Sequence, residues 1–149
     1  MVSICAKGRS HSIMASMNSP ILLLTSIRYY RERPGWDQED IKDPPWEEVE
    51  KAVRRMENYC FPIVELNPTE HEDCADRFMI VGGAGRWALR TADWEYVDPA
   101  GGEEEVRLWE SDQGYFCQAK NVLTNIEEVL RITRVFYETG SVENWGERR

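Results

Sequence analysis

Residues 77–91 constrain the fold more than any other stretch, because they combine an apolar run with a glycine-rich turn. Residues 78–81 are uninterruptedly apolar, which is typical of a strand that is covered on at least one face. Residues 82–85 read Gly-Gly-Ala-Gly, and glycine lets the backbone turn at positive φ without a clash at Cβ. Residues 86–90 alternate polar and apolar side chains. The sequence therefore predicts a β-hairpin, which we expect at the centre of a sheet.

Further strands are predicted on both sides of this hairpin. β-branched and aromatic residues favour strands near the N-terminus, and alternating polarity favours strands in the second half of the chain. A polar stretch over residues 31–42 contains Pro34-Gly35, so we expect it to be a loop. The predicted strands outside the hairpin cover residues 21–30, 61–66, 93–97, 103–109 and 115–119.

Two helices are predicted, over residues 43–58 and 124–139. In the first, we expect Asp43 to cap the N-terminus, and the apolar side chains recur at helical spacing. The second opens with Thr124-Asn-Ile-Glu127, the pattern of a capping box, and Gly140 is a natural terminator. The fold expected is α+β: a curved, mainly antiparallel sheet of about six strands with two helices packed on it. The apolar face of the first helix is expected to hold Trp46, Val49, Val53, Met56 and Cys60.

A chain of 149 residues is most simply one domain. Residues 1–19 are rich in Ser and Met and lack any period, so we expect a disordered or loosely ordered extension, with Met14 or Met17 as alternative translation starts. Residues 20–149 are expected to form the single domain, with Trp145 folded back onto its body. We find no export signal, and no segment approaches the ~20 apolar residues that a membrane span needs.

The charge balance bears on partners. Lys and Arg number 18 and Asp and Glu number 27, for a net charge of −9. Such a surface repels nucleic acid and anionic lipid, because binding to either depends on basic side chains. It attracts a basic protein and speeds the encounter. We therefore expect a basic protein partner, with no nucleic acid and no membrane.

The sequence offers few residues that could form a metal site or carry out covalent catalysis. The four cysteines are widely spaced and form no CxxC pair, so we interpret them as reduced thiols of a cytoplasmic protein. His71 and Cys74 could share a metal ion, but a zinc site generally needs four ligands in defined pairs. Residues 82–85 lack the GK[ST] ending of a phosphate loop and lead into a strand. We expect no catalytic residues, no metal and no cofactor.

The most suggestive local feature is residues 98–112, where acidic side chains surround a tryptophan. One interpretation is a solvated edge hairpin whose charges prevent aggregation. The other is an acidic patch with an aromatic anchor that docks a basic protein. Both stay open. The candidate partner-binding residues are Glu103, Glu104, Glu105, Arg107, Trp109, Glu110 and Asp112, with the loop acids Glu70, Glu72 and Asp73 as a second choice.

From Pro45 to the C-terminus, the order of motifs resembles the Imm-one family of bacterial immunity proteins, which neutralise polymorphic toxins. The motifs are Pro45-Trp46 opening a helix, the run and glycine-rich turn over residues 78–83, and Trp94 to Pro99. Gln113-Gly-Tyr115 follows, and then the helix ending Phe136-Tyr-Glu-Thr-Gly140 with Trp145 after it. The resemblance covers about two thirds of the chain, and residues 1–44 lie outside it.

The resemblance implies an α+β fold, no enzymatic activity and binding of a cognate toxin's C-terminal domain, often a nuclease or deaminase. Two other hypotheses stay open: an acidic adaptor for some other basic partner, and a hydrolase that uses carboxylates or a metal at His71 and Cys74. We predict that Ile80→Asp unfolds the protein, whereas Glu104→Lys leaves it folded and weakens partner binding.

Overall fold

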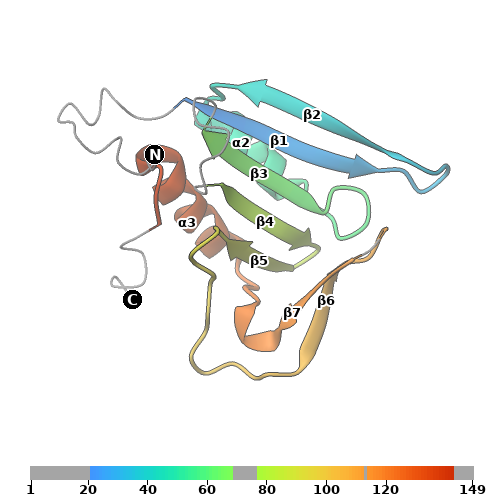
Figure 1. Ribbon diagram of the computed structural model, residues 1–149, viewed down its shortest axis with the longest axis vertical. Helices are drawn as coiled ribbons and strands as arrows, with labels where there is room; N and C mark the ends of the chain where they lie inside the picture. The colour runs from blue at the N-terminus through green and yellow to red at the C-terminus, as the bar shows by residue number, and fades with distance from the viewer. Residues whose placement is uncertain (1–20, 69–76, 113, 143–149) are drawn as a thin grey trace.

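The computed structural model describes residues 21–68, 77–112 and 114–142. Five antiparallel strands form the main sheet in the order β2-β1-β3-β4-β5, and a separate hairpin joins β6 to β7 (Figure 1). The elements are β1 (Leu22–Tyr29), β2 (Trp36–Lys42), α2 (Trp46–Arg54), β3 (Ile63–Pro68), β4 (Phe78–Gly83), β5 (Arg86–Arg90), β6 (Glu105–Trp109), β7 (Tyr115–Gln118), η1 (Ala119–Asn121) and α3 (Ile126–Thr139). The predicted α+β class is confirmed, with the strands divided between two sheets.

Both helices pack on one face of the main sheet, where the larger core lies (Figure 1). Alternate residues of each strand point to this face, so Leu24, Leu66 and Ile80 are almost fully buried. The helices contribute Val49, Val53 and Phe136, and the ring of Phe136 stacks on that of Phe78 at 5.1 Å. The predicted apolar face of the first helix is confirmed at Val49 and Val53, whereas Met56 and Cys60 lie beyond the end of α2 at Arg54.

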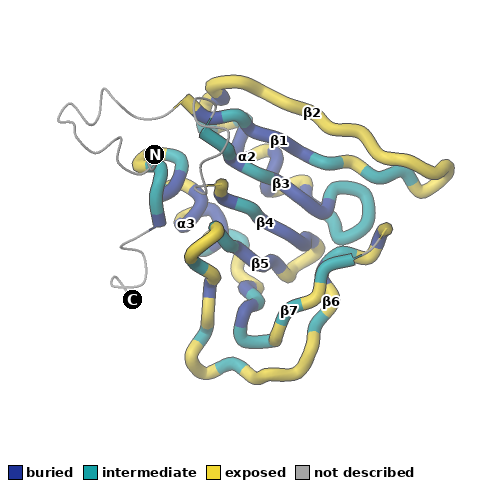
Figure 2. The backbone as a smooth tube through the Cα atoms, in the orientation of Figure 1, coloured by how far each residue is buried: buried dark blue, intermediate teal, exposed yellow. Residues whose placement is uncertain are grey.

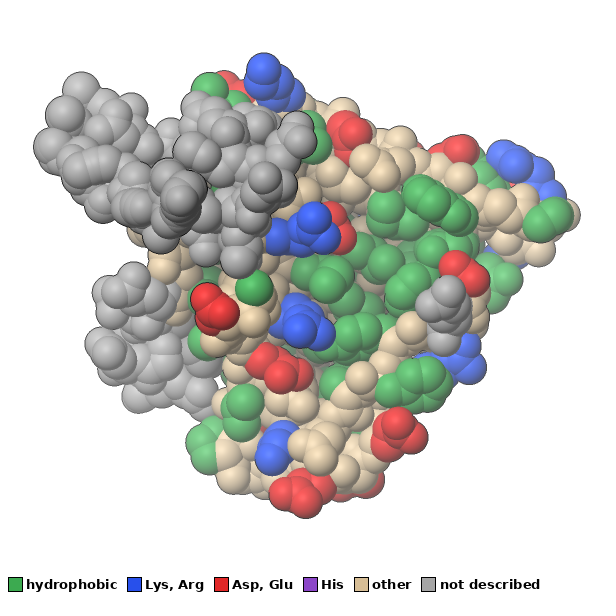
Figure 3. Space-filling view, viewed as in Figure 1, with side chains coloured by type: hydrophobic (Ala, Val, Ile, Leu, Met, Phe, Trp, Pro, Cys, Tyr) green, Lys and Arg blue, Asp and Glu red, His purple; other side chains and the backbone are tan. Residues whose placement is uncertain are grey.

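The opposite face of the sheet is covered only in part. The β6–β7 hairpin packs on β4 and β5 through a small cluster centred on Val81, Ala88 and Leu108. The rest of this face stays open, and Figure 3 shows hydrophobic side chains lining a hollow there, with charged groups around its rim. The sheet therefore has one face that the helices cover and one face that the hairpin covers in part, which leaves an accessible hollow.

The predicted central hairpin exists, but its position in the sheet differs from the prediction. β4 and β5 pair across the Ala84–Gly85 turn, where both residues have positive φ. The central strand is β3, and β5 ends the order of the sheet. The outer side of β5 is closed by irregular backbone, since Trp87 exchanges two backbone hydrogen bonds with Leu123 at 2.7 and 2.9 Å. Chain segments outside the strands thus protect this edge.

The sequence predicted a loop over residues 31–42, but only residues 31–35 form one. Trp36–Lys42 form β2, which pairs with all but the first residue of β1. All seven residues of β2 are exposed, and Figure 2 shows the strand as one uninterrupted exposed segment. The prediction failed because an edge strand that buries nothing has no apolar alternation to reveal it.

Three smaller predictions are also wrong. Residues 93–97 form no strand, because only Arg90 and Glu95 pair there as an isolated bridge. Asp43 does not cap α2, whose N-cap residue is Pro45 without a side-chain hydrogen bond. α3 begins one residue later than its capping-box pattern suggested, with the Asn125 side chain accepting from the backbone N–H of Glu127 at 2.9 Å.

Other predictions fall on residues outside the described part of the chain. These are the loosely ordered extension over residues 1–19, the possible metal ligands His71 and Cys74, and the folded-back Trp145. No helix of the described ranges is long and apolar enough to cross a membrane.

Candidate functional site

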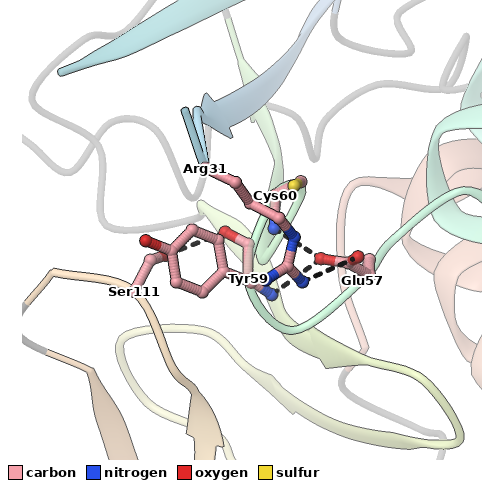
Figure 4. Close-up of polar contacts among 5 residues, drawn as sticks. All are labelled: Arg31, Glu57, Tyr59, Cys60 and Ser111. Carbon is pink, nitrogen blue, oxygen red and sulfur yellow. Dashed lines mark hydrogen bonds and ion pairs between the residues drawn. The ribbon is translucent and has the colours of Figure 1, made fainter. Parts of the chain in front are cut away.

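Glu57 organises the short loop between α2 and β3. Its carboxylate accepts hydrogen bonds from the backbone N–H groups of Cys60 at 2.6 Å and Tyr59 at 3.0 Å (Figure 4). Arg31 pairs with the same carboxylate at 3.2 Å and lies 4.3 Å above the ring of Tyr59. Burial alone would raise the pKa of Glu57, but the two N–H groups and Arg31 outweigh it and lower that pKa. The loop is therefore fixed by a charged carboxylate.

Ser111 fastens the turn of the β6–β7 hairpin to this loop. Its buried hydroxyl donates to the carbonyl of Tyr59 at 2.8 Å (Figure 4) and accepts from the indole N–H of Trp109 at 2.9 Å. The backbone N–H of Glu110 donates to the carbonyl of Asn58 at 2.8 Å. Trp109 was predicted as an exposed anchor, but its indole is partly buried and lies 5.6 Å from the ring of Tyr29. It thus joins the hairpin to the main sheet.

A cleft of about 560 Å³ opens where the β1–β2 connection faces the β6–β7 turn. Four of its eleven lining residues are aromatic, and the Tyr29 and Trp36 rings lie 6.4 Å apart. Trp36 is the most exposed large hydrophobic residue that the structure describes, at 53%. We call this the aromatic cleft; it is lined by Tyr29, Tyr30, Arg31, Glu32, Arg33, Pro34, Gly35, Trp36, Tyr59, Ser111 and Asp112.

The opposite end of the β6–β7 hairpin holds a second hollow, of about 410 Å³. Three carboxylates line it against the single charge of Arg90, and the ring of Phe116 is 49% exposed beside them. One of the three, Glu103, lies 3.8 Å from the ammonium group of Lys120. We call this the acidic groove; it is lined by Arg90, Glu95, Glu103, Glu105, Tyr115, Phe116, Cys117, Gln118 and Asn121.

The predicted partner-binding residues therefore separate into two groups. Glu103 and Glu105 line the acidic groove, whereas Asp112 lines the aromatic cleft. Glu104 lines neither. Arg107 lies between the two groups, where its guanidinium donates to the carbonyls of Trp109 and Glu110 at 3.0 and 3.2 Å. Glu110 is exposed at the turn, and Glu70, Glu72 and Asp73 lie outside the described residues.

Two exposed aromatic residues were missed as candidates, Trp36 and Phe116. Trp36 fell in the predicted loop, and Phe116 fell in a predicted strand to which no site residue was assigned. A signal existed for Phe116, because period-two alternation places Tyr115 and Cys117 on one face of β7 and Phe116 on the other.

Metal and thiol chemistry finds little support in the described ranges. They hold no group of three or more His, Cys, Asp or Glu side chains arranged to bind a metal ion. Cys60 and Cys117 are free thiols. Burial, and secondarily the charge of Glu95, raises the pKa of Cys117 to about 11. At neutral pH that thiol is protonated and a weak nucleophile.

Three comparisons with known proteins found no relative of this chain. No family model, no curated protein and no solved structure matches the chain.

Proposed function

We propose that this protein is a non-catalytic immunity protein that binds the C-terminal domain of a bacterial toxin and neutralises it by covering its active site. The observation that carries the proposal is the acidic groove, which three carboxylates and the half-exposed Phe116 line together, with the Arg107 guanidinium 5.5 Å from the ring of Phe116. The resemblance to Imm-one immunity proteins over residues 45–149 supports the toxin as the partner. A cytoplasmic location follows from this proposal.

The groove suits a basic protein surface. Glu95 and Glu105 have no salt-bridge partner among the described residues, so their charges are available to lysine or arginine of a partner. The net charge of −9 adds long-range attraction and raises the association rate. Phe116 supplies apolar area, and burying a large aromatic side chain is the usual source of a binding hot spot.

A toxin that acts on nucleic acid fits this chemistry best. A nuclease or a nucleic-acid deaminase holds its substrate with arginine and lysine side chains, because the substrate backbone is anionic. Carboxylates placed against those side chains would both bind the toxin and exclude its substrate. Neutralisation then needs no chemistry from the immunity protein itself.

Co-expression with the toxin encoded beside this gene tests the proposal. Cells that produce the toxin should survive when the wild-type protein is present. The double variant Glu105→Lys/Phe116→Ala should protect poorly, since it reverses a groove charge and removes the aromatic ring. Glu47→Lys is the matched control, because Glu47 is exposed on α2, on the other face of the sheet. Continued killing with soluble wild-type protein present would refute the proposal.

The adaptor hypothesis shares the same groove and differs only in the partner. An adaptor would bind a basic protein through Glu105 and Phe116 without protecting cells from a toxin. Co-expression therefore separates the two functions, and a pull-down with the Glu105→Lys variant as control identifies a basic partner other than a toxin.

A further inference from the structure

The aromatic cleft already binds guanidinium groups of its own chain. Arg31 lies 4.3 Å above the Tyr59 ring, and Arg33 lies 3.8 Å above the Tyr30 ring. Both distances are well within the range of a cation–π contact. Two rings of the cleft, Tyr29 and Trp36, have no lysine or arginine above them in the described part of the chain.

The carboxylate of Asp112 lies beside these two rings and has no basic side chain of the described ranges paired with it. Asp112 is exposed, and the one side-chain hydrogen bond that its carboxylate accepts from the described residues is a long one, 3.3 Å from the hydroxyl of Tyr29. No lysine or arginine of the described ranges lies within salt-bridge distance of it. Arg31, which also lines the cleft, is paired with Glu57. The cleft thus combines two rings and one carboxylate that have no lysine or arginine of the described ranges on them, and it holds them together through the contacts of Tyr29 with Trp36 and Asp112.

The carboxylate is held in place by the hairpin turn. Asp112 has a φ of 55°, a left-handed conformation that aspartate tolerates better than most residues. The neighbouring Ser111 is fixed by its hydrogen bonds to Tyr59 and Trp109. Because Tyr29 also contacts Trp109, the ring and the carboxylate are positioned by the same contacts. The arrangement exists before any partner arrives.

We infer that the aromatic cleft is a binding site for one arginine side chain of the protein partner, which would lie against Trp36 and Tyr29 and pair with Asp112. Arginine fits better than lysine, because a planar guanidinium can stack on a ring and donate to a carboxylate at the same time. The identity of the partner rests on the proposed function, but the chemistry of the site does not.

The cleft and the acidic groove would then act as two contact points on one hairpin. The acidic groove lies at the end of the hairpin that carries Glu105, and the aromatic cleft lies at the hairpin turn that carries Asp112. A basic partner that lies along β6 and β7 could reach both. This assigns general charge attraction to the groove and a specific arginine to the cleft.

Titration with a short peptide tests the inference without any toxin. Ac-Gly-Arg-Gly-NH2 should shift the indole N–H resonance of Trp36 in a saturable manner at millimolar concentration. The citrulline peptide, which has the same shape without the charge, should bind about tenfold more weakly. Asp112→Asn should cause a similar loss. Trp36→Phe should retain more binding than Trp36→Leu, and because both variants lack the Trp36 indole, their binding is followed by the backbone amide resonances of Tyr29 and Asp112. Circular dichroism would confirm that each variant is folded.

Three results would overturn the inference. They are equal binding of the arginine and citrulline peptides, no shift of the Trp36 signal with either, and binding of Ac-Gly-Glu-Gly-NH2 in preference to the arginine peptide. If a toxin is neutralised while any of these results holds, the proposed function stands and the cleft assignment fails. If the arginine peptide binds but no toxin is neutralised, the reverse is true.

Discussion

Gly83→Ala should destabilise the protein more than Gly85→Ala in the same β4–β5 turn. Gly83 ends β4 with a φ of +130°, a conformation that side chains rarely adopt. A Cβ at this position would lie 2.5 Å from the backbone nitrogen of Glu57 and 2.6 Å from the carbonyl carbon of Met56. Both neighbours are backbone atoms, so neither can move away by a change of rotamer.

The magnitude follows from two separate costs. A left-handed conformation costs a residue with a Cβ about 1–2 kcal/mol. Forcing a methyl group into packed structure costs roughly 1–3 kcal/mol more. The sum of about 3 kcal/mol is a large share of the ~5–15 kcal/mol by which a domain is stable. In urea, with a slope of about 2 kcal/mol/M, the unfolding midpoint should fall by roughly 1.5 M.

Gly85→Ala provides the matched control. Gly85 also has a positive φ, +93°, but a Cβ there meets no atom within 4 Å. Only the conformational cost remains, so its midpoint should fall by roughly 0.5 M. Equal losses for the two variants would refute the reasoning, since they would show that the contact of Gly83 with the Glu57 loop costs nothing.

Three further predictions address the core, a helix end and a titration. Ile80→Asp should abolish the cooperative unfolding transition, because Ile80 is fully buried and a charge there has no partner, whereas Glu104→Lys should leave the thermal midpoint within a few degrees of wild type. Asn125→Ala should cost about 1 kcal/mol in urea unfolding, and Thr124→Ala less than about 0.5 kcal/mol, which would confirm Asn125 as the cap. Burial, and then the charge of Asp112, raises the pKa of Tyr29 to about 12, so the folded state disfavours its phenolate. The stability that Tyr29 contributes is then complete below about pH 10 and is lost as the pH rises toward 12. Phenolate absorbance should show that the pKa of Tyr29 falls in Asp112→Asn. An unchanged pKa would contradict the contact between Tyr29 and Asp112.

The elements with a strong local pattern could be predicted from the sequence. Apolar residues recur at helical spacing within each helix, and Val49 and Val53 of α2 and Phe136 of α3 are buried in the structure. Gly140 ends α3 with a φ of 78°, as expected of a helix terminator. The Gly-Gly-Ala-Gly turn of residues 82–85 is also where the sequence placed it. In each case the signal lies within a few residues of the structure it specifies.

The order of the strands and the position of β2 could not be predicted in this way. A buried apolar run shows that residues 78–81 form a covered strand, but not which strand is central. β2 carries Asp37, Gln38, Glu39 and Asp40 and is held by its backbone pairing to β1, so its own side chains do not reveal it. Strand order depends on pairing between distant segments, which local patterns do not record.

The candidate site, like the fold, could be predicted from the sequence only in part. Acidic residues close together in the sequence predicted an acidic patch over residues 98–112, and of its candidate residues Glu103 and Glu105 line the groove. The aromatic cleft joins Tyr29, Tyr59 and Asp112 from three separate parts of the chain. The hydrogen bonds of Ser111, the backbone hydrogen bond from Glu110 to Asn58 and the contact of Trp109 with Tyr29 bring these residues together. No local motif could have shown this.

Calorimetric titration of the purified toxin domain tests the central claim most directly. The wild-type protein should bind with a dissociation constant that rises with salt, and Glu105→Lys/Phe116→Ala should weaken binding about a hundredfold or more, while Glu47→Lys changes it little. If the groove variant binds as tightly as the wild type, or if the wild-type protein does not bind the toxin, the account is contradicted.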